Sequence, residues 1–105
     1  MDTTIIRFQV ANAGTPAGKV ADAELHFVGG ELDGLKLVGF AVWIRRDGQG
    51  HNVTFPSRAF NVHGERRTFA LLRAVNDQAA QDRLRDHVLQ AYLAHERELA
   101  ELSVE

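Results

Sequence analysis

The arginines in the middle of the chain are the residues best suited to chemistry in this sequence. Segment 45–73 contains no lysine and six arginines, namely Arg45, Arg46, Arg58, Arg66, Arg67 and Arg73. Only Asp47 and Glu65 oppose them, so the formal charge of the segment is six minus two, or +4. A guanidinium group is planar and binds phosphate or carboxylate through two parallel hydrogen bonds. This pattern predicts a local anion-binding surface.

The rest of the chain is acidic. Residues 1–44 hold three basic and five acidic side chains, a balance of −2, and residues 77–105 hold three and seven, a balance of −4. The 105-residue chain therefore has a net charge of −2. This value excludes a protein that coats nucleic acid or membrane through bulk charge, so a basic footprint must be local.

Two interpretations of the arginines remain open. In the first, they are surface charges that pair with the acidic C-terminal segment, for example Arg66 or Arg67 with Asp82 or Asp86, within one subunit or across a dimer. In the second, they bind the backbone of a nucleic acid. The residues predicted for this nucleic-acid site are Arg45 and Arg46 in one loop and Arg58, Arg66 and Arg67 in another.

Other kinds of site have less support in the sequence. The chain has no cysteine, no glycine-rich phosphate loop and no Gly-x-Ser-x-Gly motif. His51 and His63 could approach each other across a hairpin, but no histidine pair has a recognised metal-binding spacing. We expect no enzyme activity, no metal, no cofactor and no small-molecule substrate. Trp43 is expected in the core, and Phe60 in an exposed loop.

The compartment is predicted from what the sequence does not contain. There is no N-terminal signal-like run and no stretch of 18 or more apolar residues. We expect a cytoplasmic protein without a membrane partner.

Local patterns predict an α+β fold with an antiparallel-rich sheet of about five strands followed by one long helix. Alternating or β-branched runs indicate strands over residues 4–10, 19–28, 35–45, 51–55 and 67–73. Turns are expected at 47–50 and 61–65. Segment 77–102 lacks Gly and Pro and repeats apolar residues at helical spacing, so it predicts the helix, with Asn76 as its N-cap.

Segment 35–45 is apolar on both faces of the predicted strand. Leu37 and Trp43 would lie on one face, and Phe40 and Val42 on the other. A single helix covers one face of a sheet more easily than two, so either the sheet curls on itself or a second subunit covers the other face. This segment is the main reason to expect a homodimer.

The chain also resembles the stage V sporulation protein G (SpoVG) family of bacterial regulators, over roughly residues 19–94. The resemblance is carried by four short motifs in the order of the family: Leu37–Phe40 (LVGF), Phe55–Arg58 (FPSR), Gly64–Arg67 (GERR) and Leu84–Tyr92 (LRDHVLQAY). The chain departs from the family in having His63-Gly64 at the turn, in a turn one residue longer, and in Leu71-Leu72-Arg73 after the following strand.

This resemblance implies a small dimer with a sheet and a C-terminal helix that binds DNA or RNA through basic residues. By position, it carries that role to Arg58, Arg66 and Arg67, whereas Arg45 and Arg46 follow from charge alone. We therefore predict one domain over residues 1–105, with its sheet at 4–73 and its helix at 77–102. Its predicted function is that of a dimeric nucleic-acid-binding regulator, of unknown nucleic-acid type. The alternative is a non-catalytic protein-interaction module in which the arginines are structural and the acidic helix is the partner surface.

Overall fold

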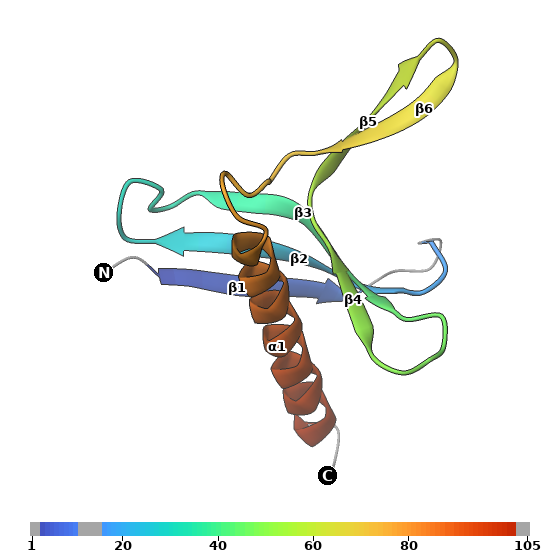
Figure 1. The fold of residues 1–105 in the computed structure, drawn as a ribbon. Coiled ribbons are helices and arrows are strands. Elements are labelled where there is room, and N and C mark those ends of the chain that lie inside the picture. Colours follow the sequence, from blue (N-terminus) through green and yellow to red (C-terminus); the bar gives the residue numbers. More distant parts are fainter. Residues whose placement is uncertain (1–2, 11–15, 103–105) are drawn as a thin grey trace.

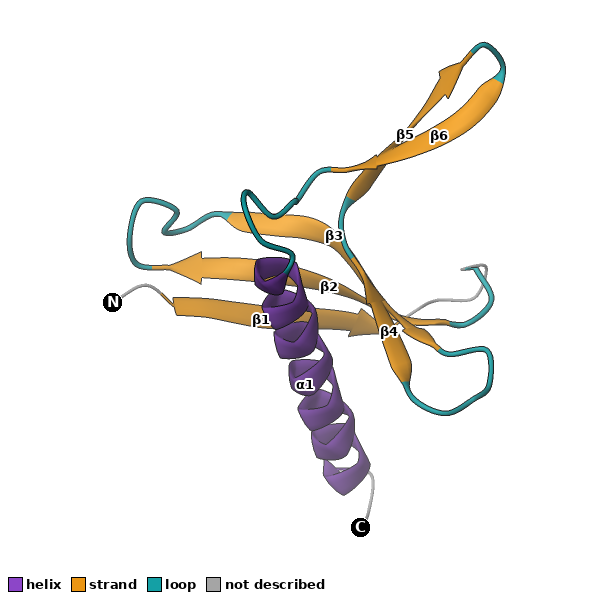
Figure 2. Cartoon of the chain, in the orientation of Figure 1, coloured by secondary structure: helices purple, strands orange, loops and turns teal. Residues whose placement is uncertain are grey.

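The computed structural model describes residues 3–10 and 16–102; residues 1–2, 11–15 and 103–105 of the predicted domain lie outside the described residues. The described part has the predicted α+β fold, with strands followed by one long helix (Figures 1 and 2). Its elements are β1 (Thr3–Val10), β2 (Lys19–Val28), β3 (Lys36–Ile44), β4 (His51–Thr54), β5 (Ser57–Val62), β6 (Glu65–Ala70) and α1 (Ala79–Leu102).

The first four strands form one antiparallel sheet in the order β1-β2-β3-β4. Helix α1 lies across one face of this sheet (Figure 1). The alternation of β2 agrees with the prediction, because Ala21, Ala23 and Leu25 are buried and the polar residues between them are not. Together with Phe40 and Val42 of β3, Val53 of β4, and Val88 and Tyr92 of α1, they make up the core.

A β-bulge in β3 changes which residues face the helix. Ala23 pairs with Phe40 and Leu25 pairs with Leu37, so three steps along β3 match two along β2. The extra residue lies at Val38–Gly39 and brings Leu37 onto the side of Phe40. The predicted division of segment 35–45 into two alternating faces is therefore wrong at Leu37. Val38, 53% exposed, lies on the outer face of the sheet beside Asp22 and Glu24.

Gly39 allows this bulge and a close contact with Pro56. Its φ is +110°, and a Cβ on it would lie 3.0 Å from the Cβ of Pro56. We expect Gly39→Ala to lower the free energy of unfolding by at least about 2 kcal/mol, because backbone strain and a steric conflict add together. Thermal melting measures this loss as a fall in Tm.

Gly48→Ala is the matched control for Gly39→Ala. Gly48 also has a positive φ, +75°, but a Cβ there would meet nothing within 4 Å. The control is expected to cost about 1 kcal/mol, the backbone strain alone. Equal melting temperatures for the two variants would show that the approach to Pro56 places no steric demand on residue 39.

Helix α1 ends at Leu102, as predicted, and begins two residues after the predicted start. Its N-cap is Asp77 and not Asn76, because the Asp77 Oδ1 accepts a hydrogen bond from the Ala79 N–H at 3.0 Å. The aspartate also places a negative charge at the positive end of the helix dipole, which favours it as a cap. In the described part of the chain, no helix is long and apolar enough to cross a membrane.

Strands β5 and β6 pair with each other and form a separate two-stranded hairpin that projects from the sheet (Figures 1 and 2). Pro56 separates it from β4, consistent with a residue that has no N–H to donate. Only β6 was predicted here, over 67–73; the expected loop around Phe60 is instead strand β5. At the tip, His63 and Gly64 have φ values of +52° and +82°, and Val62 pairs with Glu65. The turn expected at 61–65 is therefore present, and it is a two-residue turn.

Candidate nucleic-acid interface

The structure divides the five predicted arginines into two groups. Arg58, Arg66 and Arg67 lie on the β5–β6 hairpin. Arg45 and Arg46 follow β3 in the turn that leads into β4, and this turn and the hairpin lie at opposite ends of β4 (Figure 1). All five side chains are exposed. The hairpin therefore carries a basic surface of its own, apart from the β3–β4 turn.

The register of the hairpin determines which of its side chains share a face. Arg58 pairs directly with Phe69, and Phe60 pairs directly with Arg67. Directly opposed residues of an antiparallel pair project to the same side, as do residues two apart along one strand. On this side of the hairpin, each phenylalanine therefore lies opposite one arginine and is the neighbour of the other arginine along its own strand. We call this side the arginine–phenylalanine face, defined by Arg58, Phe60, Arg67 and Phe69.

The two rings of this face are in contact with each other and remain accessible. Their centroids are 6.2 Å apart with planes at 85°, an edge-to-face arrangement. Phe60 is 40% exposed and Phe69 is 43% exposed. Arg73, which was not among the five predicted site residues, extends the face because its Cζ lies 5.3 Å from the centroid of the Phe69 ring.

Arg66 lies on the other side of the hairpin. It pairs with Asn61, and the rest of that side consists of small or short polar side chains: Ser57, Ala59, Thr68 and Ala70. Adjacent positions in a strand point to opposite sides. The Gly64–Arg67 motif therefore does not present its two arginines to one ligand surface.

The hairpin arginines are weakly paired or unpaired within the described residues. Arg67 Nη2 lies 3.2 Å from Glu65 Oε2, but both side chains are more than half exposed, so this ion pair contributes little. Arg58 and Arg66 make no ion pair within residues 3–10 and 16–102. The predicted pairing of Arg66 or Arg67 with the helix acids is absent there, and its version across a dimer stays a prediction.

The lysines on the outer face of the sheet, unlike the hairpin arginines, have acidic partners on their own face. Lys19 pairs with Asp22, and Lys36 lies 3.4 Å from Glu24. His26 donates a hydrogen bond to Glu24 at 2.7 Å, and this bond is the main cause that holds the pKa of Glu24 below its ordinary value. The charged Glu24 carboxylate and the Asp22 side chain therefore compete with any incoming anion for the lysines of this face, in contrast to the hairpin.

The other side chains with potential chemistry form no metal site in the described part of the chain. His51 packs against Tyr92 with ring centroids 5.3 Å apart, while His63 lies at the hairpin tip, so the two histidines do not meet as predicted. No group of three potential metal ligands occurs among the described residues. Trp43 was predicted in the core, but it is partly exposed. Its Nε1–H donates a hydrogen bond to Thr54 Oγ1 at 2.8 Å.

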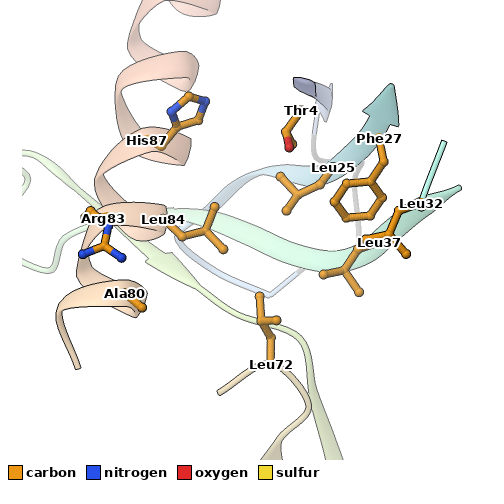
Figure 3. A pocket seen from close by; sticks show the side chains of 10 residues that line it. All are labelled: Thr4, Leu25, Phe27, Leu32, Leu37, Leu72, Ala80, Arg83, Leu84 and His87. Carbon is orange, nitrogen blue, oxygen red and sulfur yellow. The ribbon is translucent and has the colours of Figure 1, made fainter. Parts of the chain in front are cut away.

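A groove of about 550 Å³ between the N-terminal half of α1 and the sheet was not anticipated from the sequence. It is lined mainly by apolar side chains from β2, β3, the loops and the helix, among them Leu25, Phe27 and Leu84 (Figure 3). Arg83 and His87 come from the helix side (Figure 3). No local pattern could reveal it, because its walls are far apart in sequence. None of the residues that line it belongs to the hairpin.

Comparison of the chain with protein-family models, with curated proteins and with solved structures finds no match in any of the three. The resemblance to the SpoVG family therefore stays a prediction.

Proposed function

We propose that this chain is a non-catalytic nucleic-acid-binding protein that holds the sugar–phosphate backbone on its β5–β6 hairpin. One observation carries the proposal: a projecting hairpin bears exposed arginines that are unpaired or weakly paired within the described residues. Cationic side chains that neutralise phosphates release condensed counterions, and this release drives binding that is independent of sequence. Phosphate contacts position a protein without reading bases, and this suits a surface of arginines.

The five predicted site residues have unequal roles in this proposal. Arg58 and Arg67 share one face of the hairpin and contact the same stretch of backbone, with Arg73 beside them. Arg66 projects from the opposite side. Arg45 and Arg46 lie beyond the other end of β4 and do not contact that stretch.

The wider proposal is that of a homodimeric bacterial regulator in the cytoplasm, as the SpoVG resemblance implies. A second copy would cover the outer face of β3, where Val38 is exposed. Two hairpins in one particle would raise the affinity for a long strand through effective concentration. Light scattering coupled to size-exclusion chromatography measures the mass directly, and a particle of 11.6 kDa would exclude the dimer.

The test of nucleic-acid binding is fluorescence anisotropy with labelled single-stranded DNA, duplex DNA and RNA at low and near-physiological salt. With about three phosphate contacts, the logarithm of the affinity for a single strand should fall with the logarithm of salt concentration at a slope of about −2. No binding at low salt would overturn the proposal. That result would favour the protein-interaction module, in which the exposed acids of α1 meet the partner.

A further inference from the structure

We propose that the arginine–phenylalanine face selects single-stranded nucleic acid, with bases stacked on Phe60 and Phe69 and phosphates held by Arg58, Arg67 and Arg73. This inference rests on the proposed function and specifies its ligand class. It follows from the register of the hairpin, which places both rings on the side of Arg58 and Arg67, and from the contact of Arg73 with the Phe69 ring.

The exposure of the two rings is not explained by core packing. Phe40 of β3 and Phe55, which follows β4, also form an edge-to-face pair, at 5.2 Å, but Phe40 is fully buried. Phe60 and Phe69 belong to a separate two-stranded sheet, and among the described residues their ring partners are each other and Arg73. Each ring therefore keeps surface on which a base can stack, a contact that any base can make.

The spacing of the face suits a strand whose bases are unstacked. Neighbouring side chains on one side of a strand are about 7 Å apart, twice the rise per residue. Stacked bases follow one another at about 3.4 Å. A nucleic acid that follows Arg58 to Phe60, or Arg67 to Phe69, must open its base steps. This costs a single strand less than a duplex, because a duplex must unstack both of its strands at the same step.

The composition of the face disfavours reading of a duplex. A two-stranded β-ribbon fits the major groove of B-DNA, but recognition there depends on polar side chains that bond to base edges. Here Asn61 and Thr68 are on the side opposite the rings, and the polar residue on the ring side besides the arginines is Glu65. A duplex would therefore meet either two arginines beside the apolar rings, or a single arginine, Arg66, beside short polar side chains.

The experiment compares a labelled thymidine oligomer of about 20 nucleotides with a labelled duplex of about 20 base pairs at the same salt concentration. The wild-type protein should bind the single strand at least about 10-fold more tightly. In Phe60→Leu/Phe69→Leu, the side chains stay apolar while the aromatic faces are lost. This variant should bind the single strand at least about 25-fold more weakly, since each stacked base accounts for about 5-fold or more. Its affinity for the duplex should change less than about 2-fold.

Two further variants keep the test decisive if the double substitution disturbs the hairpin. Phe60→Trp reports stacking directly, because its fluorescence should be quenched by the oligomer beyond any change seen for Trp43 in the wild type. Arg67→Ala and Arg66→Ala remove the same charge from adjacent positions on opposite sides, so Arg67→Ala should weaken binding more. Thermal melting of each variant checks that the main domain remains folded.

The outcomes separate this inference from the function on which it rests. Preference for the single strand, lost in the leucine variant and accompanied by tryptophan quenching, supports both. Binding with equal affinity for the duplex, unchanged in the leucine variant, overturns the stacking inference and leaves backbone binding intact. An absence of binding to either probe at low salt overturns the proposed function, and the inference with it.

Discussion

Replacing Phe40 with alanine is expected to lower the free energy of unfolding by about 3–5 kcal/mol, the cost of deleting a fully buried ring. Phe40 has no exposed surface and lies in the cluster where β2, β3, β4 and α1 meet. Its ring packs edge-to-face against Phe55 at 5.2 Å, so truncation removes this contact and leaves a cavity. Urea denaturation followed by far-UV circular dichroism measures the loss.

Phe69→Ala is the matched control because it makes the same chemical change on the hairpin. The Phe69 side chain is 43% exposed and lies outside the core cluster, so the expected cost is within about 0.5 to 1 kcal/mol. Similar losses for the two variants would contradict a core centred on Phe40. The contrast also matters for function, because a domain of this size has only about 5–15 kcal/mol of stability. Loss of binding through Phe69 can then be separated from loss of the fold.

The parts of the fold that sequence patterns predicted are those that depend on local periodicity. Strand β2 agrees with its predicted range, Lys19–Val28, because its apolar and polar residues alternate from Ala21 to Phe27. The end of α1 agrees because a helix repeats its apolar positions along a single segment. Apolar periodicity arises because one face of a strand or helix packs against the core. It is therefore clearest in elements that have one buried face.

Strand β5 was missed for the complementary reason. All but one of the residues in Ser57–Val62 are exposed, so no buried face imposes an alternation on the sequence. Its conformation depends on pairing with β6 around the His63-Gly64 turn. The bulge at Gly39 was missed because it adds one residue and reverses the face of every position before it. A pattern with a fixed period of two cannot represent such an insertion.

In the candidate site, too, features that depend on neighbouring residues were predicted, and features that depend on strand pairing were not. Clustering in the sequence identified the basic segment, and the hairpin does carry three of the five predicted arginines. The sequence could not reveal that Arg66 and Arg67 face opposite ways, or that Arg58 and Phe69 lie across from each other. The first fact follows once both residues lie in one strand. The second depends on register, which is fixed by the position of the turn. A hairpin placed at His63-Gly64 would have been enough to find them.

Arg58→Ala/Arg67→Ala is expected to weaken binding to single-stranded nucleic acid by about 25-fold at 0.1 M salt. For a single strand, each neutralised phosphate contributes about 0.7 to the slope of log affinity against log salt. Loss of two contacts changes the slope by about 1.4, which amounts to about 25-fold between 1 M and 0.1 M salt. Anisotropy titrations at several salt concentrations measure both quantities. The fold should be unaffected, because both side chains are exposed on the hairpin.

Arg45→Ala/Arg46→Ala is the control, since it removes the same charge from the β3–β4 turn at the other end of β4. If the hairpin face holds the backbone, this variant should lose much less affinity and keep a slope near that of the wild type. Equal losses in the two double variants would mean that binding follows net charge, which would refute a defined face. A loss in Arg58→Ala/Arg67→Ala without a change of slope would also count against phosphate contacts. The loss of affinity and the change in the slope of log affinity against log salt arise from the same released counterions, so they must change together.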